Sequence, residues 1–305
     1  MSIQHEQWMA QRKRTYKSNE EKLKRFKVFK DNVEFIEKFN KAGKNKYELG
    51  VNEFADLTNE EFLAKYTGLS IPSSKRSSST SFMYKNVNAV PPNLDWRDRR
   101  AVTPVEKQGG CGSCWAFSAV AALEGINKIK TGNLVSLSKQ QILDCINTTD
   151  NCQGGWMENA FDFVSRNQGL ESDADYPYQA TNGTCRANKP SSLGARITGH
   201  QFVPSNNETA LLMAVANQPV SVGLDPSGFQ FYKGGIYTGK CGTKLTHAVT
   251  AVGYGTSEDG TKYWIFKNSW GPKFGEKGYI RLQRDIAARE GMCGIAKHAT
   301  YPTAA

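Results

Sequence analysis

Residues 108–117 read Gln-Gly-Gly-Cys-Gly-Ser-Cys-Trp-Ala-Phe, a glycine-rich turn that leads into an apolar stretch of helical periodicity over residues 115–129. The pattern predicts a helix that begins at Cys114. At a helix N-terminus, unpaired N–H groups and the positive end of the helix dipole favour a thiolate over a thiol. Gln108 stands earlier in the same segment, where its amide can donate to an oxyanion formed at a carbonyl that the sulfur attacks. One segment therefore combines a candidate nucleophile with a candidate oxyanion donor.

A Cys-x-x-Cys pair is also typical of redox and zinc sites. A zinc ribbon needs a second such pair, and the spacing of the seven cysteines offers none. A thioredoxin-like motif follows a strand in a βαβ unit, whereas the residues after Cys114 have helical periodicity. Spacing alone therefore favours a nucleophile and leaves the redox and metal interpretations open.

Length and composition predict a folded protein with more than one part. The chain has 305 residues, of which 39% are hydrophobic, and this is enough to build a core. It contains no apolar run of about 18 residues, so we expect no membrane-spanning helix. The formal charge is +10, and residues 1–89 hold 17 Lys and Arg against 11 Asp and Glu. Because these charges are interspersed and no nucleic-acid motif accompanies them, we interpret them as solvated helix faces and predict no nucleic-acid partner.

The cysteine count indicates the compartment. Seven cysteines can form three disulfides and leave one free thiol, and disulfides favour an oxidising environment. The N-terminus is polar and basic without a signal-peptide core, so we expect a targeting segment outside this sequence. Asn-x-Thr triplets make Asn147, Asn182 and Asn207 candidate glycosylation sites. These features predict a secretory destination, which is a vacuole, a lysosome or the extracellular space.

The first part of the chain reads as helical. Residues 20–41 place apolar side chains at spacings of three and four and predict one long amphipathic helix, which Gly43 ends. The elements expected after it are a short strand over 47–51, a helix over 59–66 with a capping box of Thr58 and Glu61, and a serine-rich linker over 73–81.

Beyond Pro91-Pro92 the pattern changes from helical to strand-like along the chain. Helices are expected over 114–129, 138–145 and 157–168, and strands over 220–224, 247–252, 263–267 and 278–282. This order predicts an α+β arrangement in which a helical half packs beside a β half. A cleft between the two halves is the natural place for a site.

A thiolate nucleophile needs a base that also protonates the leaving group, and histidine is the usual choice. Of the four histidines, we expect His5 in a frayed N-terminus, His200 in a turn and His298 close to the C-terminus. His247 begins a strand and is the candidate base. Asn268 follows the next predicted strand and is the candidate orienting residue.

Three segments carry a family resemblance. Cys-Gly-Ser-Cys-Trp, Leu-Thr-His-Ala-Val and Lys-Asn-Ser-Trp-Gly occur, in this order, as in papain-family cysteine proteases, which the chain resembles over its last 216 residues. The resemblance implies a papain-like catalytic domain over residues 90–305. It has a helical left lobe at about 99–200 and a β-barrel-like right lobe at about 201–297, with the termini crossing between them.

The resemblance also implies a mechanism. Cys114 attacks a peptide carbonyl, His247 acts as base and acid, and Asn268 fixes the imidazole orientation. Trp270 shields the hydrogen bond between His247 and Asn268 from water, and Gln108 is the oxyanion donor. A thiolate–imidazolium ion pair exists at rest. The substrates are proteins and peptides, and no metal or cofactor takes part.

The six other cysteines allow 15 pairings, among which sequence alone does not choose. The family pattern implies the pairs Cys111–Cys152, Cys145–Cys185 and Cys241–Cys293, which leaves Cys114 as the free thiol.

Two motifs in the N-terminal part resemble those of papain-family propeptides. The first has members at helical intervals, which an ordinary amphipathic stripe would also show. The members of the two motifs are Glu21, Arg25, Phe29, Asn32, Ile36 and Asn40, and then Gly50, Asn52, Phe54 and Asp56. Together they imply an α-helical inhibitory propeptide over residues 1–89 that runs backward through the cleft and is cleaved near Ala89. We expect acid to release it, because carboxylates such as Asp56 and Glu21 lose their charge pairs and hydrogen bonds on protonation.

The family pattern also implies a substrate pocket that favours an apolar or aromatic residue, the second on the acyl side of the scissile bond. Its expected lining and the neighbouring substrate-binding positions are Gly154, Gly155, Trp156, Met157, Gly223, Leu245, Ala248, Trp270 and His298. His298 is expected to allow some polar side chains at low pH. Thr246, Lys139 and Phe274 depart from the common pattern, and the nearest branch implied is that of plant cathepsin-L-like enzymes, including senescence-associated ones.

Two other functions remain open at this point. One is a binding or storage protein that kept the fold and lost activity, although all four catalytic candidates are present. The other is a transglutaminase, which uses the same Cys-His chemistry but would not explain the propeptide motifs. For the protease we expect a monomer, with cystatin-type inhibitors as further partners.

Overall fold

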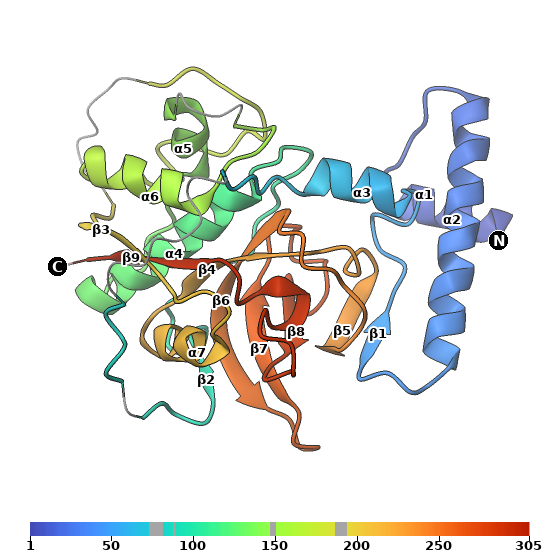
Figure 1. The fold of residues 1–305 in the computed structure, drawn as a ribbon. Helices are drawn as coiled ribbons and strands as arrows, with labels where there is room; N and C mark the ends of the chain where they lie inside the picture. Colours follow the sequence, from blue (N-terminus) through green and yellow to red (C-terminus); the bar gives the residue numbers. More distant parts are fainter. Residues whose placement is uncertain (73–81, 88, 147–150, 187–193, 305) are drawn as a thin grey trace.

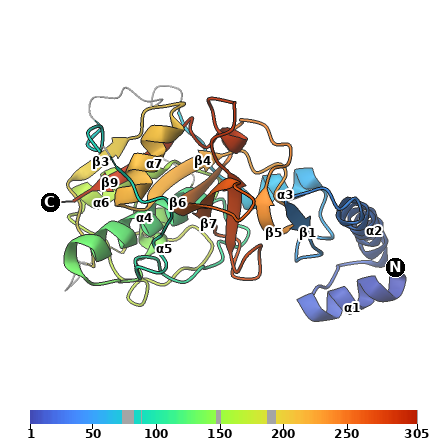
Figure 2. The same ribbon diagram turned by 90° about the horizontal axis from the view of Figure 1, so that it is seen from below.

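The computed structural model describes residues 1–72, 82–87, 89–146, 151–186 and 194–304, so the expected linker over 73–81 lies outside the described residues. The chain forms an N-terminal helical part beside a larger α+β part (Figure 1). In two perpendicular views, the first two helices lie at the end of the molecule opposite to the C-terminus (Figure 1, Figure 2).

The bounds of the elements follow. The helices are α1 (Ser2–Arg12), α2 (Asn19–Lys41), α3 (Asn59–Tyr66), α4 (Cys114–Thr131), α5 (Lys139–Cys145), α6 (Met157–Arg166) and α7 (Glu208–Asn217). The strands are β1 (Tyr47–Leu49), β2 (Leu94–Asp95), β3 (Gly199–Phe202), β4 (Val220–Leu224), β5 (Tyr232–Tyr237), β6 (His247–Thr256), β7 (Lys262–Lys267), β8 (Tyr279–Gln283) and β9 (Ala299–Thr303). A short 3₁₀ turn covers Met292–Gly294.

Local sequence signals define the ends of α2 and α3. The Ser18 hydroxyl accepts a hydrogen bond from the Glu21 N–H at 3.2 Å and so caps α2. The predicted capping box of Thr58 and Glu61 is present at the start of α3. These caps explain why the predicted and observed helices agree within a residue or two.

Helix α1 is not predicted by the sequence, because its composition is polar and only His5 and Trp8 are buried. The His5 ring centroid lies 5.0 Å from that of Phe29 and 6.0 Å from that of Trp8. The expectation that His5 belongs to a frayed N-terminus is therefore wrong. Packing of these two side chains against α2 orders a helix whose own periodicity is weak.

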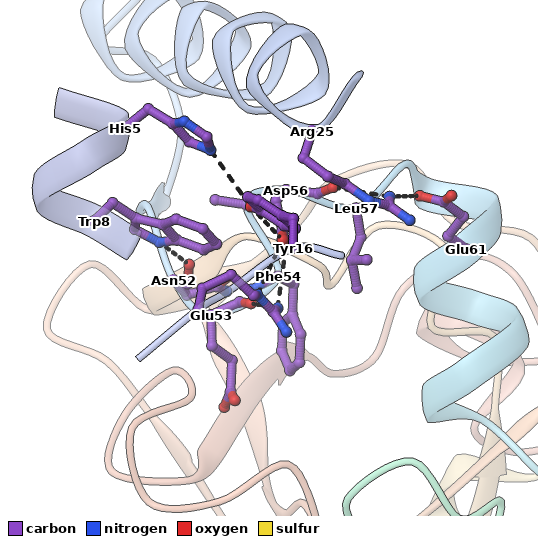
Figure 3. A network of polar contacts seen from close by, with 12 residues as sticks. His5, Trp8, Tyr16, Arg25, Asn52, Glu53, Phe54, Asp56, Leu57 and Glu61 are labelled. Carbon is purple, nitrogen blue, oxygen red and sulfur yellow. Dashed lines mark hydrogen bonds and ion pairs between the residues drawn. The ribbon is translucent and has the colours of Figure 1, made fainter. Parts of the chain in front are cut away.

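Asp56 is the centre of a polar network beneath α1 and α2 (Figure 3). Its carboxylate is buried, accepts a hydrogen bond from the Tyr16 hydroxyl at 2.9 Å and pairs with Arg14 at 3.0 Å. Arg25 donates to the Asp56 carbonyl oxygen at 3.1 Å and pairs with Glu61 at 2.6 Å. The two propeptide-like motifs therefore meet here, since Arg25 belongs to the first and Asp56 to the second.

The other motif residues hold α2 against the chain that follows it. Asn32 and Asn40 each donate from Nδ2 to a backbone carbonyl of residues 49–57 at 2.8 Å. Phe29 and Ile36 are buried between the same segments. The helical face that the motif defines is thus the face that packs.

The N-terminal part docks on the larger α+β part by adding a strand to its sheet. Strand β1 pairs with β5 antiparallel, next to a Gly50 N–H that donates to the Phe231 carbonyl at 2.8 Å. Asn52 Nδ2 donates to the Gln230 carbonyl at 2.6 Å. Phe54 is buried with its ring edge toward Trp270. The sheet order is β1-β5-β8-β7-β6-β4-β9-β3, with β2 paired to β6.

The helical half surrounds α4, whose residues from Cys114 to Ile126 are buried. Helix α5 begins after Ser138, whose hydroxyl accepts from the Gln141 N–H at 2.9 Å. The three disulfides are those that the family pattern implies: Cys111–Cys152, Cys145–Cys185 and Cys241–Cys293. Because Cys111 pairs with Cys152 rather than with Cys114, the redox-pair interpretation is wrong.

The β half contains the predicted strands and one helix that the sequence pattern did not predict. Helix α7 lies within the region read as strands, with Asn207 Oδ1 accepting from the Ala210 N–H at 2.9 Å as its cap. Its apolar run of alanine, leucine and valine satisfies strand and helix patterns alike. Among the described residues, no helix is long and apolar enough to cross a membrane.

Candidate active site

Cys114 is the first residue of α4 and the only free cysteine of the described chain, and it is fully buried. Burial raises the pKa of the Cys114 thiol to about 12, although N–H groups of Ala248, Trp115 and Gly68 act in the opposite direction. While the N-terminal part covers the site, burial thus acts against the thiolate that the helix N-terminus favours.

His247 and Asn268 come together because β6 and β7 are antiparallel neighbours. His247 Nε2 lies 2.8 Å from Asn268 Oδ1, and the imidazole stacks on Trp270 with the ring centroids 4.6 Å apart. With Asn268 Oδ1 as acceptor, the hydrogen is on Nε2 and Nδ1 keeps its lone pair. Within the described residues, this buried Nδ1 has no hydrogen-bond partner. Such a nitrogen is what a base for a thiol requires.

Burial also decides the protonation of His247. It lowers the pKa of the imidazole to about 4, while the hydrogen bond with Asn268 acts in the opposite direction. While the site is covered, burial therefore acts against charge on both Cys114 and His247. The resting ion pair implied by the family stays a prediction for the uncovered site.

Gln108 is fixed by contacts at both ends of its side-chain amide. Its Nε2 donates to the Cys111 carbonyl at 2.9 Å, and its Oε1 accepts from the Ser269 hydroxyl at 2.6 Å. The Tyr178 hydroxyl donates to the Gln108 carbonyl at 2.7 Å. Sequence reasoning missed Ser269 and Tyr178. Ser269 is detectable only as the neighbour of Asn268, and nothing in the sequence singles out Tyr178.

The N-terminal part crosses the site with residues 66–70. The Tyr66 carbonyl accepts from Trp270 Nε1 at 2.9 Å and lies 3.4 Å from Gln108 Nε2. Gly68 then passes so close that a Cβ on it would lie 2.0 Å from the Gly112 carbonyl oxygen. Only glycine fits at this point of the crossing.

Leu69 follows Gly68 into the predicted pocket. It is buried in one cluster with Cys114, Met157 and Ala248. A Cβ added to Gly223 would lie 2.8 Å from Leu69 Cδ2 and 3.5 Å from Leu245 Cδ1, so both leucines lie beside this glycine. Among the other predicted lining positions, a Cβ on Gly154 would lie 2.9 Å from the Gly68 carbonyl oxygen, and the Gly155 backbone exchanges hydrogen bonds with Gly68 and Ser70. Trp156 packs at the edge of the cluster.

The direction of the crossing is opposite to that of a substrate. Leu69 forms a parallel bridge with Gly155, and the chain runs from Trp270 past the thiol into the pocket. A substrate with its acyl-side residue in this pocket runs from the pocket toward the thiol. The peptide bonds of residues 66–70 are therefore not oriented for attack by Cys114.

His298 is buried near the pocket and has a charged partner that the sequence did not indicate. Its Nε2 lies 2.7 Å from Glu158 Oε1, and the Phe202 ring packs edge-on against it. Within the described residues, Glu158 Oε2 is buried without a hydrogen-bond partner. A histidine–carboxylate pair thus lies beneath the apolar lining.

The three departures from the family pattern each have a structural partner. Thr246 presents its carbonyl to the Gly68 and Leu69 N–H groups at 3.0 and 2.9 Å. Phe274 packs edge-on against Trp270 with centroids 4.8 Å apart. Lys139 is buried and pairs with Glu106 at 2.5 Å and Asp173 at 3.4 Å. None of these contacts removes a catalytic candidate.

The candidate glycosylation sites differ in their surroundings. Asn182 and Asn207 are exposed, and their Oδ1 atoms accept hydrogen bonds from the Cys152 and Ala210 N–H groups. Asn147 lies outside the described residues. Among the residues described, no cluster of three or more His, Cys, Asp or Glu side chains could hold a metal ion.

Comparisons with known proteins agree with this geometry. Residues 90–303 match the papain family cysteine protease, and residues 5–62 match the cathepsin propeptide inhibitor domain. The chain is 53% identical over 311 residues to the senescence-specific cysteine protease SAG39 of Oryza sativa subsp. indica, covering all of this chain and 91% of the relative.

Two solved structures are similar over the whole chain. A recombinant stem bromelain precursor is 49% identical with a TM-score of 0.92, covering 99% of this chain and 98% of the other. The ragweed pollen cysteine protease Amb a 11 in its proform is 47% identical with a TM-score of 0.92, covering 99% and 94%.

The chain therefore belongs to the papain family of cysteine proteases. It is the zymogen of a cysteine endopeptidase, and its N-terminal part is an inhibitory propeptide. The transglutaminase interpretation is wrong. We call residues 1–72 and 82–87 the prosegment and the residues from 90 onward the catalytic domain.

Proposed function

We propose that the uncovered catalytic domain hydrolyses peptide bonds with Cys114 as nucleophile, His247 as base and acid, Asn268 as orienting residue and Gln108 as oxyanion donor. The observation that carries this proposal is the 2.8 Å contact between His247 and Asn268, which leaves Nδ1 without a hydrogen-bond partner among the described residues, where Cys114 is the free, buried thiol. Transfer of the thiol proton to Nδ1 creates the nucleophile when solvent returns to the site.

The reaction then proceeds by acyl transfer. The sulfur of Cys114 adds to the carbonyl carbon, and Gln108 Nε2 stabilises the oxyanion that forms. His247 gives its proton to the departing amine as the C–N bond breaks, leaving a thioester. Water then adds to the thioester, His247 takes its proton and returns it to the sulfur, and the free acid leaves.

Active-site titration tests this proposal against the alternative of an inactive binding or storage protein. The purified chain is acid-treated and labelled with a thiol-directed epoxide, and peptide hydrolysis is measured in parallel. We expect labelling at one thiol with matching loss of activity, and neither in Cys114→Ala. Labelling without any hydrolysis would favour the inactive binding protein.

We propose further that acid triggers removal of the prosegment near Ala89. Arg14 and Arg25 hold the carboxylates of Asp56 and Glu61, so protonation of these groups removes charge pairs at the centre of the prosegment. Glu21 adds a hydrogen bond that depends on a carboxylate, since it accepts from the Lys17 N–H at the start of α2 at 3.0 Å. Mass spectrometry over a pH series is the test: conversion no faster at pH 4 than at pH 7 would contradict it.

The proposed pocket preference is apolar, as Leu69 in the pocket suggests. The His298–Glu158 pair adjoins that lining and offers hydrogen-bonding groups to a polar side chain, and we propose that such side chains are tolerated at low pH. A peptide library scanned at two pH values tests this. Strict aliphatic preference at both would rule out the polar tolerance.

The proposed setting is the secretory pathway, ending in a vacuole, a lysosome or outside the cell. Three disulfides support an oxidising compartment. A monomer with cystatin-type inhibitors as partners completes the proposal. Size-exclusion chromatography, and inhibition of the matured enzyme by a cystatin, test the last two points.

A further inference from the structure

A groove of about 510 Å³ lies where the prosegment meets the catalytic domain, and it is lined in part by Tyr66, whose carbonyl accepts from Trp270 Nε1. The prosegment contributes the end of α1 and the turn after it, and the catalytic domain contributes two loops. The lining residues are Gln11, Arg12, Lys13, Arg14, Glu53, Tyr66, Lys107, Gly271, Pro272 and Lys273. The groove is thus built from two parts of the chain that separate on activation.

The lining of this groove is strongly basic, with five cationic side chains and one carboxylate. Glu53 pairs with Lys107, and Arg14 pairs with Asp56 outside the groove. Among the described residues, the other three cations, Arg12, Lys13 and Lys273, have no carboxylate partner.

Arg12 adds an independent observation. Its Nε is buried and has no hydrogen-bond partner within the described part of the chain. A buried guanidinium N–H without an acceptor is costly, because water no longer solvates it. The side chain that lacks an acceptor belongs to the groove that holds an excess of positive charge.

We propose that this groove binds an oxyanion of the sulfate or phosphate class, and that the anion stabilises the zymogen. Guanidinium and ammonium groups from two directions around one cavity match the charge and the several acceptor oxygens of such an ion. The anion also relieves the repulsion between Arg12 and Lys13 on the prosegment and Lys273 on the catalytic domain.

The site is complete only while the prosegment is in place. After its removal, Lys107 and Lys273 remain and the other three cations are gone. A ligand that binds the covered form more tightly shifts the equilibrium toward that form in proportion to its concentration. The bound anion therefore slows the conversion in acid. Added salt would instead screen the ion pairs of the prosegment and speed the conversion.

Calorimetric titration of sodium sulfate into the full chain tests binding apart from activity. The chain carries Cys114→Ala so that it stays intact, and the reference titration uses sodium chloride at equal ionic strength. We expect one site, and about tenfold weaker binding in Arg12→Gln and in Lys273→Gln, since each removes a charged donor. Lys38→Gln, on the exposed side of α2, removes one charge elsewhere and should bind as the parent does.

Glu53→Gln is expected to increase the affinity for sulfate, which misfolding would not do. It removes the only carboxylate of the groove and frees Lys107, so sulfate binding should become tighter. Equal affinity in Glu53→Gln, Arg12→Gln and the parent would overturn the proposal. So would sulfate heats no larger than the chloride reference.

A second measurement separates a free ion from a sulfated polymer. Conversion of the Cys114-containing chain at acid pH is followed with sulfate, with dextran sulfate and with chloride at matched ionic strength. Slower conversion with sulfate supports a free anion, and slower conversion with dextran sulfate alone supports a sulfated chain. Conversion that is unchanged or faster with both would overturn the stabilising role.

Discussion

The prosegment and the catalytic domain are stabilised in different ways. The catalytic domain has two large buried clusters, all three disulfides, and a buried lysine that is balanced by carboxylates. The prosegment has a small core of its own around Trp8, Phe29 and Val33 and polar contacts around Asp56, and its later residues Phe54, Phe62, Tyr66 and Phe82 join one of the two large clusters. The prosegment is thus the part of the molecule whose stability depends most on the protonation of its charged side chains.

The pKa shifts in the prosegment give this difference a direction. Burial lowers the pKa of His5 below 6.5, so protonation favours the unfolded prosegment as pH falls through 6.5. The hydrogen bond from Arg25 lowers the pKa of Glu61 below 4.5. Its stabilisation is present above pH 4.5 and is lost as pH falls through the lowered value. Both shifts act toward release in acid, while the disulfides of the catalytic domain do not titrate.

The largest expected effect comes from unbalancing the buried charge of the catalytic domain. Burial acts to lower the pKa of Lys139, but the charges of Glu124 and Glu106 outweigh it and raise the pKa. Lys139→Glu would bring a carboxylate among these acids and should cost about 3–5 kcal/mol of stability. Chemical denaturation measures it. The double variant with Glu106→Lys should recover part of the loss, and an undiminished loss would mean that the pair is not coupled.

Removal of one disulfide should lower the stability of the catalytic domain and leave release of the prosegment unchanged. The Cys241–Cys293 bridge closes a segment of 52 residues, and Cys241→Ala with Cys293→Ala should cost about 2–4 kcal/mol. Urea unfolding of the covered chain measures the loss. The pH at which half of the prosegment is released should not change, and a shift of this midpoint would contradict the separation of the two parts.

Gly68→Ala tests the closest contact of the cover. A Cβ there would lie 2.0 Å from the Gly112 carbonyl oxygen, and overpacking of this kind costs about 1–3 kcal/mol. We expect Cys114 to react with a thiol-directed epoxide about 10 to 100 times faster at neutral pH. Ser70→Ala, an exposed neighbour, is the control. An unchanged rate in Gly68→Ala would mean that residues 66–70 do not limit access.

His5→Phe should have the smallest effect. It keeps an aromatic ring in the same cluster and removes a group that takes up a proton on unfolding. The release midpoint should therefore fall by about 0.3 pH units or more, because part of the acid dependence is lost. His200→Asn in the catalytic domain serves as the control. A rise of the midpoint would show that packing at this position outweighs titration.

Much of the site was accessible to sequence reasoning because its residues lie next to strong local signals. Cys114 follows a glycine-rich turn, and His247 and Asn268 stand at the ends of strands that their β-branched and aromatic residues predict. The disulfide pairs came from the family resemblance alone. The capping box at Thr58 located α3 to the residue.

What sequence reasoning missed depends on contacts between distant segments. Helix α1 is ordered by packing of His5 and Trp8 on α2, and its own pattern is weak. The hydrogen bonds of Tyr178 and Ser269 to Gln108 join residues that are far apart in the sequence. The partner of His298, Glu158, follows a pocket residue by one position and carries no motif.

The reversed path of residues 66–70 determines how activation spreads through a population of these molecules. A chain cannot cleave its own prosegment where residues 66–70 pass Cys114, because the backbone there runs in the opposite direction to that of a substrate. The first cleavage must fall elsewhere in the prosegment or come from another molecule that is already open. Each activated molecule can then cleave further zymogens. Conversion therefore starts slowly, accelerates, and depends on the zymogen concentration.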